Sequence, residues 1–165
     1  MKKIVLIGMP GTLKTSVGKV LAKKLDFDFL DTDEHVESVK KLCITQIFAD
    51  FGEAYFRELE HSAVLQNYHR TDIVLSAGGG LPLLNENMIL LQSWCKVWLQ
   101  ASVQTIYKRL INDVTRPLIA FEKMETIAKM QSDRFTIYKK YADICVQTDN
   151  LSVEDIATKI IEEIV

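Results

Sequence analysis

Residues 8–15 of the chain read Gly8-Met9-Pro10-Gly11-Thr12-Leu13-Lys14-Thr15. The stretch follows a short apolar run and precedes a helical pattern, and it matches the P-loop pattern G-x-x-x-x-G-K-[ST] at Gly8, Lys14 and Thr15. In a P-loop, backbone N–H groups surround the phosphates, the lysine reaches the β and γ phosphates, and the hydroxyl binds Mg²⁺. Leu13 stands where the pattern has glycine, a residue that turns freely through conformations closed to most side chains. An ordinary Gly/Pro turn is the alternative, but it does not explain why lysine and a hydroxyl residue open the helix.

Length and composition bound the class of protein to which this loop belongs. The chain has 165 residues, of which 48% are hydrophobic and 25% charged, as in one globular domain with a substantial core. A net charge of −2 indicates no nucleic-acid partner, so we expect a small ligand instead. No apolar stretch is long enough for a membrane span, and no leader is recognisable, so we expect a cytoplasmic protein with no membrane partner. The three cysteines are widely spaced in apolar surroundings, which favours buried free thiols.

Short apolar runs alternate with helical patterns along the chain. Strands are expected at 3–7, 27–30, 73–75, 96–99 and 144–146. Helices are expected at 14–25, 34–37, 44–51, 56–65, from 82 onward, 103–110, 127–141 and 153–164, with a break at Gly52. This order predicts an α/β fold of three layers, in which helices cover both faces of a central five-stranded parallel sheet. Ligands bind such folds at the carboxyl ends of the strands.

Two carboxylates, Asp31 and Asp33, follow the second expected strand. If the strand geometry persists, their side chains point in different directions, one toward a metal ion and one toward a substrate. The alternative is that Asp33 caps a helix beginning at Glu34.

Arg57 and Glu60 stand three residues apart on an expected helix, which is the spacing of an ordinary exposed ion pair. The third strand runs into Gly78-Gly79-Gly80. Consecutive glycines are costly in backbone entropy, and they favour a place where a ligand approaches the main chain closely.

Arg116 precedes a proline in a weakly periodic segment, about residues 112–124. The residue before proline is biased away from helix, so Arg116 is expected to project from a loop. It is either a solvated surface residue or part of a lid that brings an arginine onto the transferring phosphoryl group.

The chain as a whole closely resembles shikimate kinases, within the group of P-loop proteins similar to nucleoside monophosphate kinases. The resemblance rests on six motifs in this order and spacing: Gly8 to Ser16, Asp31-Thr32-Asp33, Gly52-Glu53-Ala54-Tyr55-Phe56-Arg57-Glu58-Leu59-Glu60, Gly78-Gly79-Gly80, Arg116-Pro117-Leu118-Ile119, and Arg134 through Tyr138 to Ala142-Asp143. The combination of G-E-x-x-F-R-x-x-E, triple glycine and R-P-L is not expected in gluconate kinase. One single kinase domain over 1–165 is implied, with a substrate-binding excursion at about 32–60 and the lid at about 112–124.

The resemblance implies a role for each matching position. The nucleotide and its metal ion would be held by Gly8, Gly11, Thr12, Leu13, Lys14, Thr15, Ser16, Asp31, Arg109 and Arg116. Of these, Thr15 and Asp31 would bind Mg²⁺, and Arg109 would lie against adenine. Shikimate would be held by Asp33, Arg57, Gly78, Gly79, Gly80 and Arg134. The two arginines, Arg57 and Arg134, would bind its carboxylate. The catalytic groups would be Asp33, Lys14 and Arg116, with Asp33 as the base. The family's Arg-x-Pro near 148–152 is missing, since Asp149-Asn150-Leu151 stands there.

The implied reaction is transfer of the γ phosphoryl group of ATP to the 3-hydroxyl of shikimate, in the biosynthesis of chorismate and aromatic amino acids. Mg²⁺ is the implied cofactor, ATP the co-substrate, and a monomer the expected state. The alternative is a weakly active or non-catalytic binding protein, in which Leu13 has spoiled the phosphate loop.

Overall fold

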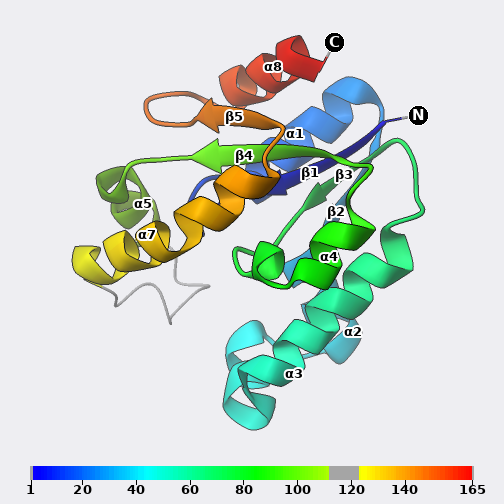
Figure 1. The fold of residues 1–165 in the computed structure, drawn as a ribbon, viewed down its shortest axis with the longest axis vertical. Coiled ribbons are helices and arrows are strands. Elements are labelled where there is room, and N and C mark those ends of the chain that lie inside the picture. The colour runs from blue at the N-terminus through cyan, green and yellow to red at the C-terminus, as the bar shows by residue number, and fades with distance from the viewer. Residues whose placement is uncertain (1, 112–122, 165) are drawn as a thin grey trace.

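The computed structural model describes residues 2–111 and 123–164. Its strands are β1 (Lys3–Ile7), β2 (Asp28–Asp31), β3 (Ile73–Ser76), β4 (Cys95–Gln100) and β5 (Ile144–Gln147). They form one sheet in the order β2-β3-β1-β4-β5, and every neighbouring pair is parallel (Figure 1). The predicted five-stranded parallel sheet is confirmed.

The helices follow the expected order. They are α1 (Lys14–Leu25), α2 (Thr32–Lys40), α3 (Ile44–Asn67), the 3-10 turn η1 (Leu81–Leu83), α4 (Asn85–Leu90), α5 (Val103–Leu110), α7 (Met124–Tyr141) and α8 (Val153–Ile164). The sequence placed α1 and α5 at their observed bounds. It placed the start of α2 two residues too late, because Thr32 already belongs to the helix.

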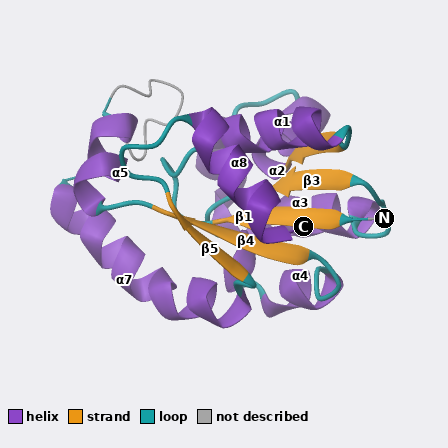
Figure 2. Ribbon diagram, turned by 90° about the horizontal axis from the view of Figure 1, so that it is seen from above, coloured by secondary structure: helices purple, strands orange, loops and turns teal. Residues whose placement is uncertain are grey.

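Helices cover both faces of the sheet, as the three-layer prediction requires. Alternate residues of β1 divide between two cores, with Ile4 and Leu6 in one and Val5 and Ile7 in the other. Helices α1 and α8 pack on the first face, whereas α3, α4, α5 and α7 contribute to the second core. Figure 2 shows α1 and α8 on one side of the strands and α4 and α7 on the other.

Gly52 divides α3 into two helical parts. Its φ of 84° and ψ of 171° are not helical, and φ lies in the region that favours glycine. The break confirms the predicted interruption, and it lets the first part of α3 fold back on α2. These two helices share a small core around Val36, Ile47 and Phe56.

The strand order changes direction at β1, because β2 and β3 lie to one side and β4 and β5 to the other. The phosphate loop follows β1, Asp31 is the last residue of β2, and the glycine stretch follows β3. In sheets of this kind the ligand crevice lies at such a switch point. The fold therefore brings the predicted motifs to one edge of the sheet.

The prediction for the cysteines is partly wrong. All three are free, but Cys43 and Cys145 are exposed and Cys95 is half-buried. Cys145 lies on β5, an edge strand whose side chains alternate between the core and solvent, which apolar neighbours in the sequence did not reveal. Within the described parts of the chain, no helix has both the length and the apolar composition needed to cross a bilayer.

Candidate active site

Leu13 adopts a backbone conformation that glycine favours. This residue has φ 69° and ψ 20°, a left-handed conformation, directly before the first residue of α1. Its carbonyl accepts the first helical hydrogen bond, from Val17 N, at 2.8 Å. The loop therefore turns as a glycine would turn there, and a leucine side chain bears the steric cost.

The side chain of Lys14 binds the main chain of the phosphate loop. Its side chain is buried, and Nζ donates to the carbonyl oxygens of Gly8 at 2.9 Å and Met9 at 2.8 Å. Thr12 supports the same turn, because its hydroxyl donates to Met9 O at 2.8 Å. The lysine charge is thus fixed at the start of α1, where free N–H groups favour an anion.

Leu13 leads to the first prediction. Glycine adopts this conformation without the roughly 1–2 kcal/mol that a leucine loses there. We expect Leu13→Gly to tighten binding of a non-hydrolysable ATP analogue about three- to thirtyfold and to leave shikimate affinity unchanged. Leu13→Ala is the control, since it removes the packing of the side chain against the core around Leu21 but keeps the strained Cβ. Equal nucleotide affinity of Leu13→Gly and the wild type, in calorimetric titrations, would show that the strain does not weaken binding.

Asp31 connects the phosphate loop to α2 and is the N-cap of that helix, so the alternative in which Asp33 is the cap is wrong. Its Oδ1 accepts from the N–H groups of Asp33 at 2.9 Å and Glu34 at 3.2 Å, so Asp31 and not Asp33 caps the helix. Its Oδ2 accepts from the Thr15 hydroxyl at 2.6 Å. The strand ends at Asp31, and Asp33 lies in the first turn of α2. The side chains of the two aspartates therefore point in different directions because of the change from strand to helix, and not because they alternate along a strand.

The pair of Thr15 and Asp31 fits a magnesium ion. Mg²⁺ prefers oxygen ligands and is usually held by one or two protein oxygens together with phosphates and water. A hydroxyl and a carboxylate already in contact at the end of a phosphate loop supply that donor set. Among the described residues no group of three or more His, Cys, Asp or Glu side chains is placed to bind a metal.

The glycine stretch is crowded by side chains of the site. A Cβ on Gly78 would collide with Asp33 Oδ1 and Glu60 Oε1, and one on Gly80 would collide with the guanidinium of Arg57. At Gly79 it would lie 2.9 Å from Pro10 Cδ and 3.2 Å from an Arg134 nitrogen. The glycines are therefore needed for close approach, here by the charged side chains themselves.

Arg57 and Glu60 are not the exposed pair that their spacing suggested. Glu60 is 1% exposed, and its Oε2 accepts from Arg57 at 2.5 Å, while the other arginine nitrogen donates to the exposed Glu53 at 2.9 Å. Glu60 Oε1 is buried with no hydrogen-bond partner among the described residues. Burial raises the pKa of Glu60 to about 7; Arg57 opposes the rise, and the charge of Asp33 adds to it. Glu60 is a site residue that the sequence analysis missed, although it lies in the quoted G-E-x-x-F-R-x-x-E motif.

The pKa of Glu60 leads to the second prediction. It rises from 4.5 to about 7 on folding, so the folded chain holds this proton more tightly than the unfolded chain does. The resulting stabilisation is complete below pH 4.5 and is lost as the pH rises through about 7. We expect the unfolding free energy of the wild type to fall relative to Glu60→Gln by roughly 3 kcal/mol over this range. Urea titrations at several pH values test this, with the exposed Glu58→Gln as control. A difference between wild type and Glu60→Gln that stays constant with pH would contradict the assignment.

Arg134 lies on the opposite side of the same glycines. It projects from α7 toward Gly79, whose carbonyl accepts from Tyr138 at 2.6 Å. Burial raises the pKa of Tyr138, against the charge and hydrogen bond of Arg134. Since Gly79 and Gly80 are adjacent, Arg134 and Arg57 reach the same short piece of main chain from α7 and α3. The sequence did not predict the tyrosine that fixes this main chain.

Arg109 reaches the phosphate loop from α5. Its guanidinium donates to Gly11 O at 3.1 Å, to the Thr148 hydroxyl at 3.0 Å and to Thr148 O at 3.0 Å. Arg109 therefore lies between the loop and the turn after β5. Arg116 and most of the predicted lid, about 112–124, lie outside the described part of the chain, and the last two positions of the lid are the N-cap and the first residue of α7.

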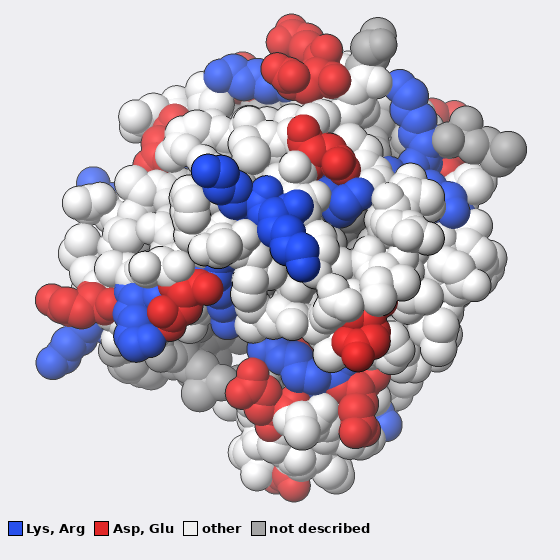
Figure 3. Space-filling model, in the orientation of Figure 1, with Lys and Arg blue, Asp and Glu red and all other residues white. Residues whose placement is uncertain are grey.

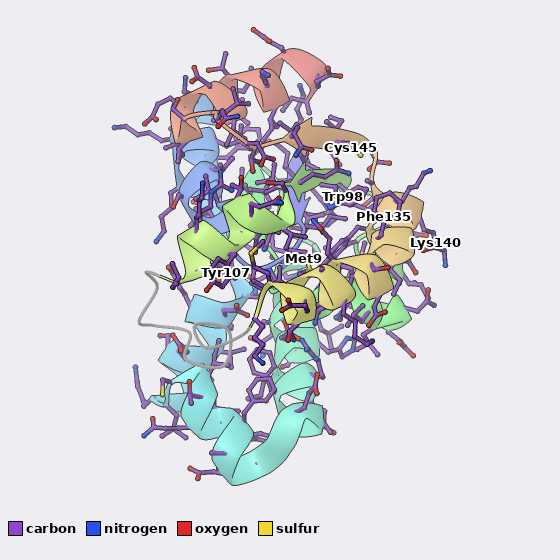
Figure 4. The ribbon with its side chains drawn as sticks, turned by 90° about the vertical axis from the view of Figure 1, so that its left-hand side faces the viewer. Met9, Trp98, Tyr107, Phe135, Lys140 and Cys145 are labelled. Atoms are coloured by element: carbon purple, nitrogen blue, oxygen red, sulfur yellow. The ribbon has the colours of Figure 1, made fainter. Side chains whose placement is uncertain are left out.

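A cavity of about 210 Å³ lies among the phosphate loop, the two aspartates after β2 and the glycine stretch, and Arg57, Gly80 and Arg134 are not among its lining residues. The predicted residues that line it are Gly11, Leu13, Lys14, Thr15, Ser16, Asp31, Asp33, Gly78, Gly79 and Arg109. A larger cavity, of about 650 Å³, lies beside Met9, Trp98 and Phe135, which Figure 4 shows between α7 and the sheet. Among the described residues, no side chain that lines the larger cavity is charged, whereas the smaller cavity contains Lys14 and so suits an anionic ligand better.

On the face shown in Figure 3, acidic and basic side chains are interspersed and do not form one basic surface. The fold, the P-loop and the pair of Thr15 and Asp31 define a P-loop protein of the kind that binds nucleoside phosphates. A second set of charged side chains, Asp33, Arg57, Glu60 and Arg134, lies around the glycine stretch.

Comparisons with known proteins identify the family. The model of the family described as shikimate kinase matches residues 10–165. The shikimate kinase of Thermodesulfovibrio yellowstonii is 42% identical over 165 residues, covering 99% of this chain and 95% of the relative. That of Caldicellulosiruptor saccharolyticus is 40% identical over 163 residues, covering 98% and 94%. This chain therefore belongs to the shikimate kinase family.

Solved structures of shikimate kinases resemble this fold over nearly all of the chain. The shikimate kinase from Acinetobacter baumannii in complex with shikimate has a TM-score of 0.93 at 31% identity, covering 99% of this chain and 93% of that one. The shikimate kinase from Aquifex aeolicus has a TM-score of 0.85 at 31% identity, covering 98% and 95%. The fold is that of P-loop kinases.

Proposed function

We propose that this chain transfers the γ phosphoryl group of ATP to the 3-hydroxyl of shikimate. The observation that supports this most is the pair of arginines, Arg57 and Arg134, that meets adjacent glycines beside Asp33. Two guanidinium groups suit a carboxylate, and a carboxylate side chain nearby suits hydroxyls. The cavity with the phosphate loop lies directly beside these groups.

Each side has its own task in the proposal. Lys14, the loop N–H groups and the start of α1 hold the β and γ phosphates, while Arg109 lies at the adenine end. Thr15 and Asp31 would hold Mg²⁺, which would supply positive charge to neutralise the phosphates. Arg57 and Arg134 hold the carboxylate of shikimate, and the main chain at Gly78, Gly79 and Gly80 lies along the ring.

The chemical step needs no covalent intermediate. The 3-hydroxyl oxygen bonds to the γ phosphorus, the bond from that phosphorus to the β–γ bridging oxygen breaks, and ADP leaves. The proton of the hydroxyl passes to Asp33. Lys14 and Arg116, the latter carried by the proposed lid, balance the charge that moves onto the bridging oxygen. Catalysis is by positioning and charge neutralisation.

The alternative of a non-catalytic binding protein predicts that Leu13 distorts the phosphate loop so that it no longer binds the phosphates. Instead, Leu13 adopts the left-handed conformation that the loop requires, and Lys14 makes its contacts inside it. These observations favour an active enzyme.

A coupled assay of ADP release tests the proposal. With Mg²⁺ and ATP, we expect ADP to appear only when shikimate is added, at a rate that saturates with shikimate. ADP release at the same rate without shikimate, or none with it, would contradict the proposed reaction.

We also propose one kinase domain acting as a cytoplasmic monomer, without nucleic acid or membrane partners. Three free cysteines and use of ATP suit a reducing cell interior.

A further inference from the structure

The turn after β5 is bonded to both ends of α5. At the first end, Asp149 Oδ1 accepts from the hydroxyls of Ser102 at 2.7 Å and Thr105 at 2.5 Å, and its Oδ2 accepts from Ser102 N at 3.1 Å. Ser102 is the N-cap of α5, and its oxygen also accepts from Thr105 N at 3.2 Å. The carboxylate of Asp149 thus accepts hydrogen bonds from the N–H and hydroxyl groups at the start of α5.

The second end of α5 is held by the residue next to Asp149. Thr148 is completely buried, and its hydroxyl donates to Gln100 O at 2.8 Å and accepts from Arg109 at 3.0 Å. Thr148 O accepts from the other Arg109 nitrogen at 3.0 Å. Arg109 in turn donates to Gly11 O in the phosphate loop at 3.1 Å.

These bonds form a continuous path from Asp149 to the nucleotide side of the site. Helix α5 runs only from Val103 to Leu110, about 12 Å at 1.5 Å per residue, so a shift at its first turn also moves Arg109. Burial lowers the pKa of Arg109, and the charge of Asp149 opposes this, which indicates that the two groups are also coupled electrostatically. Figure 1 shows α5 and the turn after β5 at the same end of the sheet.

We propose that Asp149 is a positioning residue for the nucleotide: it locks the turn after β5 onto α5 and so holds the Arg109 guanidinium against Gly11. Asp149 stands in the stretch where the family pattern Arg-x-Pro is missing. In this chain the turn therefore supports the nucleotide through α5. The inference rests on the assignment of Arg109 to the nucleotide under the proposed function.

The test compares Asp149→Ala and the milder Asp149→Asn with Arg109→Ala and the double variant Asp149→Ala/Arg109→Ala. The matched control is Asp155→Ala. Asp155 likewise accepts from a serine hydroxyl and N–H, those of Ser152 at 2.6 Å and 3.3 Å, but it does so at the start of α8. Each variant is measured for KM of ATP, KM of shikimate, kcat, and melting temperature.

We expect Asp149→Ala to raise the KM of ATP about tenfold and Asp149→Asn about threefold, because charge-assisted bonds are lost in part or in full. The KM of shikimate should stay within about twofold, as a shift of α5 does not reach Arg57. Asp155→Ala should change neither KM. The double variant should be no worse than Arg109→Ala alone, because Asp149 acts through Arg109.

Other outcomes overturn the inference, and they separate it from the proposed function. If Arg109→Ala raises the KM of ATP but Asp149→Ala does not, Asp149 has no positioning role and the nucleotide site stands. Additive effects in the double variant, or equal rises in both KM values, would also refute the role. If neither Arg109→Ala nor Asp149→Ala changes the KM of ATP while turnover persists, the assignment of Arg109 to the nucleotide is wrong and the inference falls with it.

Discussion

Asp33→Asn is expected to lower kcat by about two to four orders of magnitude, the usual contribution of a general base. An amide cannot take the proton of the attacking hydroxyl, but it has nearly the same shape as the carboxylate. Asp33 lies in the first turn of α2, with Oδ1 against Gly78, and it lines the cavity that contains the phosphate loop. Binding of Mg·ATP should stay nearly intact, because the hydroxyl of Thr15 pairs with Asp31.

The contrast variant for this prediction is Asp31→Asn. It weakens the acceptor that faces Thr15, so it should raise the Mg²⁺ concentration needed for half-maximal rate. It should also destabilise α2, because Asp31 caps that helix. Steady-state kinetics over a range of Mg²⁺ concentrations distinguish the raised Mg²⁺ requirement of Asp31→Asn from the lowered kcat of Asp33→Asn. Equal phenotypes for Asp31→Asn and Asp33→Asn would contradict the division of tasks between the two aspartates.

Arg57→Ala is expected to weaken shikimate binding by about 2–4 kcal/mol, or roughly 30- to 1000-fold, while ATP affinity changes little. The arginine is only 24% exposed and is fixed between Glu53 and Glu60. Under the proposed function, this fixed guanidinium would bind the carboxylate of shikimate without first being ordered, and its loss would remove a bidentate contact. Calorimetric titration with shikimate measures the effect directly.

Two controls accompany this prediction. Removing Arg57 leaves Glu60 buried without its ion-pair partner, so the melting temperature of Arg57→Ala must confirm that the protein is folded. Glu53→Ala removes only the exposed partner and should change shikimate affinity by less than about 1 kcal/mol. Unchanged shikimate affinity in folded Arg57→Ala would remove Arg57 from the substrate site.

Much of the fold follows from local pattern. Continuous apolar runs such as Ile4 to Ile7 predicted strands buried on both faces, and periodicity predicted α1, α5 and α8. The boundary at Asp31 was missed, because both a strand end and a helix cap favour aspartate nearby, and only the bonds to Asp33 N and Glu34 N decide between them.

The chemistry of the site was less predictable where it depends on burial. Spacing alone could not show that Glu60 is buried against Gly78, because an i,i+3 pair looks the same on an exposed helix. The same holds for Asp149, whose partners Ser102 and Thr105 are distant in sequence and meet it only because β4 and β5 are neighbours. The conformation of Leu13 was left open by the sequence, and the structure shows that it is the left-handed one that glycine favours.

The most direct test of the proposed function is to identify the product by phosphorus and proton NMR after mixing equal amounts of ATP and shikimate with catalytic enzyme and Mg²⁺. We predict one new phosphate monoester, at the 3-hydroxyl, formed in equal amount to ADP. Inorganic phosphate in place of the monoester, or phosphate on another hydroxyl, would contradict the proposed placement of shikimate between Asp33 and the two arginines.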